Sequence, residues 1–167
     1  APGRAGGAPP APPGPSLTLG VTEIEQVVLR AIRVKAGIVS ADEKEADLRR
    51  LLNYGHTIGH GIEAALKYEQ LTHGEAVAWG MIAANAVAER RGLLDAPTRQ
   101  RIDDAVRAWD PTPLPPLSAD DVLSATEHDK KNTGSARIMI LPQQIGRCAV
   151  VEVTEEDVRH GIAALMR

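Results

Sequence analysis

The stretch LLNYGHTIGHGIEAALKYEQLTHGEAVAWG, from Leu51 to Gly80, decides the fold of this chain. It carries three of the five histidines among 167 residues. His56 and His60 lie four positions apart, so on a helix both side chains point to one face. A connection then leads to His73, just before the next helical segment, and it is long enough for the chain to fold back. The spacing therefore predicts that the three imidazoles converge from consecutive helices.

These histidines are candidate metal ligands, because neutral imidazoles converging from two helices suit a divalent ion such as zinc. Thr57 stands where the H-E-x-x-H motif of metalloproteases has its glutamate, which excludes that class. Glycine costs ~1 kcal/mol at each helical site, so Gly55, Gly59, Gly61 and Gly74 indicate that the backbone approaches something closely here. The alternative is that the histidines are ordinary surface or core residues at a chance spacing.

A second group of residues predicts a site for a small anionic ligand. Arg49 and Asn53 lie one helical turn before the histidines, Lys35 lies upstream, and Lys130 lies in the basic segment 128–134, where we expect a turn. Guanidinium and ammonium groups beside a metal pocket suit a ligand with several carboxylate or phosphate oxygens. The alternative for each of them is a solvated surface charge.

Composition narrows the class of protein. The net charge of -3 predicts no general affinity for nucleic acid or for a membrane surface. Cys148 is the single cysteine, so there is no internal disulfide and no cysteine-based zinc site, and a cytoplasmic protein is expected. Ala1 to Pro15 consists of Ala, Pro and Gly apart from Arg4. We therefore expect residues 1–20 to be disordered and residues 21–167 to form one domain.

Hydrophobic periodicity predicts a mainly α domain with one small β-hairpin. The Thr22–Glu25 pair is a candidate capping box for the first helix, and Thr154 with Asp157 is another for the last. The expected helices cover residues 22–39, 48–67 with a break at Gly55, 75–91, 97–109, 118–127 and 154–166, and the strands cover 136–142 and 146–153.

Three motifs in order give the chain a resemblance to a known family. They are KAGIVSADEKEADLRRLLNYGHTIGHGIEAAL, then HGEAVAWGM, then DKKNTG. Together they resemble 3-dehydroquinate synthase, the sugar-phosphate cyclase of the shikimate pathway of aromatic amino acid biosynthesis, from Thr22 to the C-terminus. The resemblance implies a helical C-terminal domain that packs against an N-terminal NAD-binding domain, with the active site between them.

The resemblance also implies roles for seven residues, each matched by position. The implied zinc ligands are His56 and His73. The implied contacts to the substrate phosphate are His60, Asn53 and Lys130. The implied contacts to the carboxylate end of the substrate are Arg49 and Lys35.

The implied reaction converts 3-deoxy-D-arabino-heptulosonate 7-phosphate to 3-dehydroquinate and phosphate, with zinc or another divalent metal such as cobalt, and NAD. The family's NAD-binding domain and its third zinc ligand, a glutamate, have no counterpart in these 167 residues. We therefore expect weak metal binding, NAD bound mainly by a separate N-terminal half, and no activity of the chain alone. The family also implies a homodimer.

Two other functions stay open at this point. One is a domain of a sister cyclase that makes an inosose or a valiolone ring, because the histidines are shared with those enzymes. Arg49 and Lys35 favour a substrate with a carboxylate. The other is a non-catalytic module that binds a partner through its exposed face.

Overall fold

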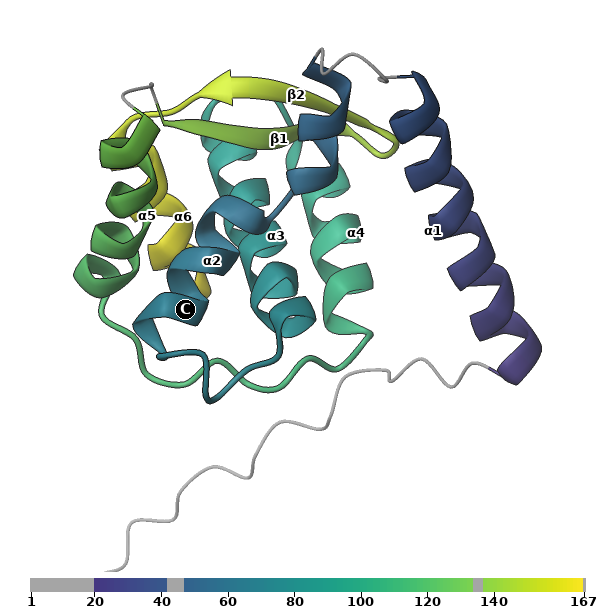
Figure 1. The fold of residues 1–167 in the computed structure, drawn as a ribbon, viewed down its shortest axis with the longest axis horizontal. Coiled ribbons are helices and arrows are strands. Elements are labelled where there is room, and N and C mark those ends of the chain that lie inside the picture. Colours follow the sequence, from purple (N-terminus) through teal and green to yellow (C-terminus); the bar gives the residue numbers. More distant parts are fainter. Residues whose placement is uncertain (1–19, 42–46, 134–136, 167) are drawn as a thin grey trace, which may run out of the picture.

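A computed structural model describes residues 20–41, 47–133 and 137–166, with the backbone alone at 21, 47 and 127–133. The segment expected to be disordered, 1–20, lies outside the described residues except for Gly20. The elements in chain order are α1 (Val21–Ala41), the 3-10 helix η1 (Asp47–Asn53), α2 (His56–Ala65), α3 (His73–Arg90), α4 (Ala96–Arg107), α5 (Ala119–Thr133), β1 (Ile138–Gln144), β2 (Arg147–Glu152) and α6 (Glu155–Leu165). The predicted mainly α fold with one hairpin is confirmed (Figure 1).

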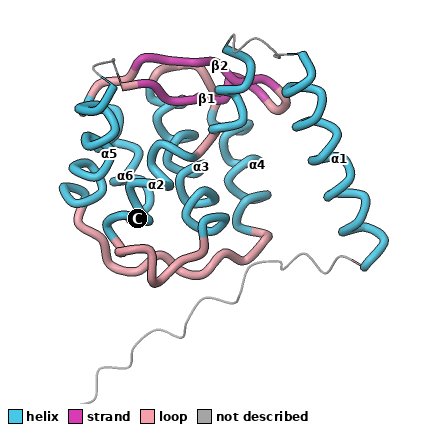
Figure 2. The backbone as a smooth tube through the Cα atoms, in the orientation of Figure 1, coloured by secondary structure: helices cyan, strands magenta, loops and turns pink. Residues whose placement is uncertain are grey.

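The centre of the domain is α3. Its run of alanines and small residues is buried on nearly every side from Ala76 to Ala88. Small side chains let neighbouring backbones approach closely, and α2, α4, α6 and β1 all pack against this helix. Figure 2 shows the hairpin lying across one end of these helices. This arrangement makes α3 the support for both the helices and the sheet.

The core contains no phenylalanine, because the sequence has none. Its largest fully buried side chains are aliphatic, with one methionine: Ile58, Ile62, Ile82, Met139, Leu141, Ile162, Val87, Val122 and Val158. Two of these come from α2, so the apolar face of that helix is anchored inside the domain. The opposite face of α2 is therefore held in a fixed direction.

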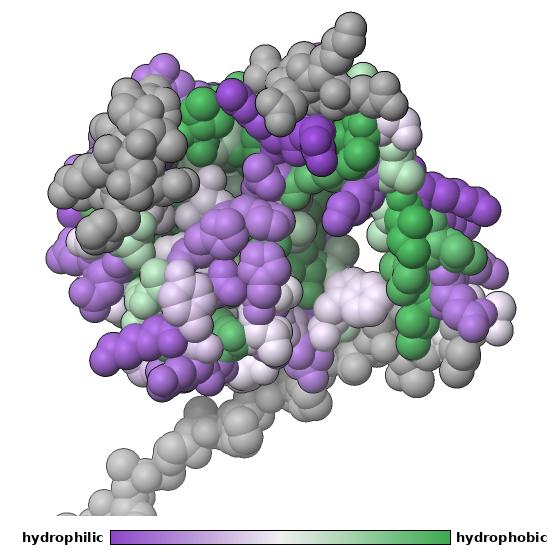
Figure 3. Space-filling view, in the orientation of Figure 1, coloured by the Kyte–Doolittle hydropathy of each residue, from purple (hydrophilic) through white to green (hydrophobic). Residues whose placement is uncertain are grey.

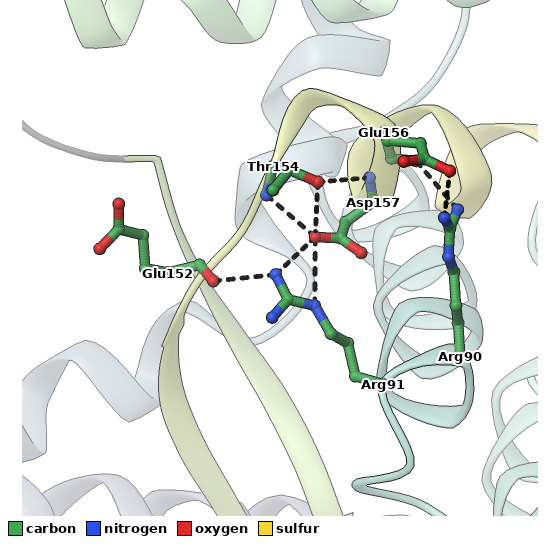
Figure 4. Close-up of polar contacts among 6 residues, drawn as sticks. All are labelled: Arg90, Arg91, Glu152, Thr154, Glu156 and Asp157. Carbon is green, nitrogen blue, oxygen red and sulfur yellow. Dashed lines mark hydrogen bonds and ion pairs between the residues drawn. The ribbon is translucent and has the colours of Figure 1, made fainter.

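Polar contacts join α3 to the hairpin and α6. The guanidinium of Arg91 donates to the Glu152 carbonyl at 3.1 Å and to the Asp157 carboxylate, as Figure 4 shows. Asp157 also completes the predicted capping box with Thr154 at the start of α6. β1 and β2 pair antiparallel, from Ile138 opposite Glu152, with an irregularity between Pro142 and Gln144.

Three local predictions were wrong. The basic segment 128–134 was expected to be a turn, but α5 continues to Thr133, since no glycine or proline occurs between Ala119 and Thr133. The cap of α1 lies two residues earlier than expected, because the Glu23 carboxylate accepts from the backbone N–H of Gly20 at 2.8 Å. The segment 48–53 forms a 3-10 helix rather than an α-helix.

Helix α1 stands beside the other helices rather than among them (Figure 1), and among the described elements its main contact is with η1. Figure 3 shows a column of hydrophobic side chains along it. The exposed apolar residues of α1 are Ile24, Val27, Val28, Leu29, Ile32 and Val34. None of the described helices is both long enough and apolar enough to cross a membrane.

Candidate metal and anion site

The three histidines of the motif meet at one place on the surface. The ring centroids lie 5.3 Å apart for His56 and His73, 5.5 Å for His56 and His60, and 5.6 Å for His60 and His73. The predicted convergence from consecutive helices is therefore present. A tighter set of donor atoms, all within 4.8 Å of one another, comes from His60, Glu63 and His73.

Helix α2 supplies two of these imidazoles because of where it begins. Gly55 adopts φ of 82°, a left-handed conformation that glycine accepts readily, and the helix starts at the next residue. His56, His60 and Glu63 then follow at helical spacing on one face. Ile58 and Ile62 on the other face are fully buried, so packing sets the direction in which the imidazoles point.

The third imidazole is brought close by a tight crossing of α2 and α3. A side chain at Gly80 would place its Cβ 2.0 Å from the Gly55 carbonyl oxygen, and one at Gly59 would place it 3.1 Å from the Ala76 oxygen. The glycines therefore allow backbone contact between the two helices. Gly74 takes no part, because nothing lies within 4 Å of the equivalent point there.

His73 is the first residue of α3, and a capping box holds that end of the helix. The Thr72 hydroxyl accepts from the Glu75 backbone N–H, and the Glu75 carboxylate accepts from the Thr72 backbone N–H at 2.8 Å. Hydrogen bonds from Thr112 and from Thr72 lower the pKa of Glu75 to about 2. The carboxylate thus stays ionised and ties the start of α3 to the loop at Thr112.

The contacts of the two predicted zinc ligands leave the same ring nitrogen available in each. His56 Nδ1 lies 3.2 Å from the Tyr54 carbonyl oxygen, which only accepts, so Nδ1 carries the proton. His73 Nδ1 lies 3.2 Å from both Glu63 carboxylate oxygens. In the neutral form of both rings, Nε2 is then the nitrogen that keeps its lone pair. Imidazole Nε2 atoms whose Nδ1–H donates to a protein oxygen are typical of zinc ligands, so this donor set fits zinc or cobalt.

Three of the five expected anion-binding residues lie together beside His56. A cavity of about 420 Å³ is lined by Lys35 from α1, by Arg49 and Asn53 from η1, and by His56. Arg50 and Leu52 also line it. Segments far apart in sequence thus combine two guanidinium groups, an ammonium and an amide in one hollow. Such a lining attracts carboxylate or phosphate groups.

A second cavity, of about 510 Å³, is lined by other residues of the cluster. Its lining includes His60 and Glu63 from α2 and Thr126 from α5. His60, expected to contact phosphate, therefore faces a different hollow from Arg49 and Asn53. The side chain of Lys130, the other predicted phosphate contact, lies outside the described residues.

Sequence reasoning did not single out Glu63, which the structure places against His73. Its signal was present, because it follows His56 by seven positions and His60 by three, the spacing of one helical face. A buried network behind the site was also missed. The Tyr54 hydroxyl donates to Asn85 Oδ1, and Asn85 Nδ2 donates to Asp103 at 2.7 Å. This network ties the junction of η1 and α2 to α3 and α4.

Comparison with known proteins begins with a family model. Residues 16–132 match the model described as 3-dehydroquinate synthase C-terminal. The matched residues include every predicted site residue from Lys35 to Lys130.

Curated relatives point the same way. The 3-dehydroquinate synthase of Koribacter versatilis is 41% identical over 143 residues, covering 85% of this chain and 39% of the relative. The 3-dehydroquinate synthase of Microcystis aeruginosa is 44% identical over 128 residues, covering 76% of this chain and 35% of the relative. The chain thus spans about 40% of the length of the curated relatives it matches.

Similar solved structures are sugar-phosphate cyclases. The 2-epi-5-epi-valiolone synthase of Streptomyces hygroscopicus, with NAD+ and Zn2+ bound, is 28% identical with a TM-score of 0.74, covering 87% of this chain and 41% of that protein. A 2-deoxy-scyllo-inosose synthase with carbaglucose-6-phosphate, NAD+ and Co2+ is 27% identical with a TM-score of 0.73, covering 84% and 41%. With the family model matching most of its length, the chain belongs to the 3-dehydroquinate synthase C-terminal family.

Proposed function

We propose that this chain is the metal- and substrate-binding half of a 3-dehydroquinate synthase, a lyase that converts 3-deoxy-D-arabino-heptulosonate 7-phosphate to 3-dehydroquinate and phosphate. The observation that carries the proposal is the convergence of three imidazoles beside a cationic cavity. The family match and the identity of about 40% to curated synthases support the choice of reaction.

In this proposal the chain's own residues bind and orient the substrate. Arg49 and Lys35 hold its carboxylate end through the cavity that they line. Asn53, His60 and Lys130 hold the phosphate. Fixing both charged ends leaves the ring in one orientation for reaction, which removes much of its rotational freedom in advance.

His56 and His73 are the proposed metal ligands, each through Nε2. When bound, the metal supplies a Lewis acid that polarises a substrate oxygen. The structural neighbours carry Zn2+ or Co2+ with NAD+. Catalytic zinc usually has three protein ligands, so we propose that the remaining ligand comes from outside this chain.

NAD is proposed to bind mainly to a separate N-terminal half, because the relatives are more than twice as long as this chain. Two apolar surfaces could receive that half. One is the exposed face of α1, and the other is a groove of about 520 Å³ lined by Met81, Val106 and Trp109 among others. Burying apolar area of this kind drives association. A homodimer and a cytoplasmic location stay predictions.

A sister cyclase is the second candidate, because the similar solved structures make valiolone and inosose rings. Their identity of 27–28% to this chain is lower than the 41% of the Koribacter versatilis synthase. The two cationic residues proposed to hold a carboxylate favour 3-dehydroquinate synthase. Binding of the heptulosonate phosphate in preference to carbaglucose 6-phosphate, which has no carboxylate, would support this choice, and the reverse order would favour the sister reaction.

Metal binding tests the site directly. Zinc affinity of the 167-residue chain would be measured by competition with a chromophoric chelator, alongside His56→Ala, His73→Ala and, as a matched control, His160→Ala on α6. We expect each of the first two substitutions to abolish the weak binding and the control to leave it unchanged. Equal zinc affinity in all four proteins would refute the proposed site.

An activity assay tests the proposal that this chain needs a separate N-terminal half to catalyse the reaction. The chain would be mixed with zinc, NAD and substrate, with and without the separately produced N-terminal portion of the Koribacter versatilis synthase. We expect phosphate release only from the mixture that contains both halves. Steady turnover by the chain alone would show that it needs no second half.

A further inference from the structure

The buried carboxylate of Glu63 is the most unusual group near the proposed metal ligands. Glu63 is only 8% exposed, yet its two oxygens lie 3.2 Å from Nδ1 of His73, whose side chain is 57% exposed. Removing a carboxylate from water is costly unless hydrogen bonds compensate. The imidazole of His73 supplies such a bond across the crossing of α2 and α3.

This contact sets which nitrogen of His73 carries its proton. An ionised carboxylate only accepts hydrogen bonds, so Nδ1 donates, and in the neutral imidazole Nε2 is the nitrogen with a free lone pair. It also fixes the ring's direction, because Glu63 belongs to α2, whose opposite face is anchored in the core by Ile58 and Ile62. His56 is held in the same way by the Tyr54 carbonyl at 3.2 Å. The two rings thus present equivalent nitrogens, although they begin different helices.

We propose that Glu63 is the positioning residue for His73, holding the imidazole in the Nδ1–H tautomer with Nε2 directed to the metal. This inference rests on the proposed function of His73 as a ligand. A carboxylate acting through a histidine also raises the basicity of the coordinating nitrogen. Glu63 lies within 4.8 Å of His60 and His73 donor atoms, so direct ligation is the competing arrangement that the experiment must separate.

The first measurement needs no metal. Long-range ¹H–¹⁵N correlation spectra of the metal-free chain report the tautomer of each histidine. We expect His73 to be an Nδ1–H tautomer in the wild type and to shift to the Nε2–H form in Glu63→Ala. Glu69→Ala, which removes an exposed carboxylate on the connection between α2 and α3, is the charge-matched control and should leave the spectrum unchanged. A His73 tautomer that is the same in the wild type and in Glu63→Ala would overturn the proposal.

The second measurement uses metal alone. Loss of a residue that hydrogen-bonds to a metal-ligating histidine typically weakens metal affinity 10–100-fold. We therefore expect about tenfold weaker zinc binding in Glu63→Gln and a larger loss in Glu63→Ala. The visible spectrum of the Co2+-loaded Glu63→Gln chain should keep the wild-type shape, because the ligands are the same. A changed spectrum would make Glu63 a ligand and refute a positioning role.

The outcomes separate this inference from the proposed function. If His73→Ala loses zinc while both Glu63 variants bind as the wild type does, the positioning role is refuted and the metal site stands. If His73→Ala itself binds zinc as the wild type does, the metal site fails. Unfolding curves for each variant show whether any loss comes from an unfolded protein, and Glu63→Gln, close in size to glutamate, is the variant expected to remain folded.

Discussion

Replacing Gly80 by alanine should test the helix crossing that brings the histidines together. The added Cβ would lie 2.0 Å from the Gly55 carbonyl oxygen and 2.7 Å from the Gly59 backbone nitrogen. Both obstacles are backbone atoms, so no side chain can rotate away. A Cβ needs about 3 Å from such an oxygen, so α2 and α3 must separate by about 1 Å at this point.

We expect Gly80→Ala to lower the free energy of unfolding by about 3 kcal/mol, the upper end of the range for overpacked cores. A domain of this size is usually stable by 5–15 kcal/mol, so the variant should fold but unfold at lower urea concentration. The same movement displaces His56 and His60 relative to His73. Metal–ligand distances tolerate only about 0.2 Å, so zinc affinity should fall at least tenfold.

Urea unfolding followed by circular dichroism, together with zinc titration, measures both effects. Gly74→Ala is the matched control in the same helix, because nothing lies within 4 Å of its added Cβ. Alanine there should be neutral or stabilise by about 0.5–1 kcal/mol. An ordinary surface substitution changes the free energy of unfolding by no more than about 0.5 kcal/mol. If Gly80→Ala stays within that limit and binds zinc as well as the wild type does, the α2–α3 crossing does not hold the site.

Two further substitutions test the contacts behind the site and at the far end of α3. Tyr54→Phe removes the hydrogen bond to the fully buried Asn85 and should cost about 1–3 kcal/mol in urea unfolding; an unchanged midpoint would show that the network contributes nothing. Asp157 is largely buried, which raises its pKa, but hydrogen bonds from Arg91 and Thr154 outweigh this and lower the pKa from 3.8 to about 2. The ionised carboxylate therefore stabilises the fold above about pH 4, and this contribution is lost as the pH falls through 2. We expect the free energy of unfolding of Asp157→Asn to be lower than that of the wild type by up to about 2 kcal/mol at pH 6 and nearly equal to it near pH 2. A difference that is the same at both pH values would contradict this linkage.

The helices were predictable because their apolar residues recur at helical spacing and because side-chain caps mark several of their starts. The predicted capping box of Thr154 and Asp157 is present, while the predicted box at Thr22 and Glu25 is not. At the start of α1, the expected pair of Thr22 and Glu25 competes with a second pair two residues earlier, Gly20 and Glu23. Glycine is also accepted at the N-cap position of a helix. Local pattern alone does not choose between two overlapping caps.

The histidine cluster could be expected from spacing, but its closeness depends on tertiary packing. Periodicity places His56 and His60 on one face, whereas the approach of His73 requires the contact of Gly80 with the backbone of α2. Glu63 was overlooked because a carboxylate within an apolar helix has many ordinary explanations. The cavity that unites Lys35 with Arg49 and Asn53 depends on where α1 meets η1, which no local pattern specifies.

The histidine cluster and the cationic residues beside it are exposed to water. The His73 side chain is 57% exposed, and Lys35 and Arg49 are exposed as well, so water reaches the site in this chain. Charged interactions are weak in water and strengthen when water is excluded. A second half that covers this face would therefore strengthen every contact made by the imidazoles and the cationic groups. Binding of that half would cost little entropy at the site, because the capping box and the α2–α3 crossing already hold the three imidazoles together. The ring centroids of His56, His60 and His73 lie within 5.6 Å of one another.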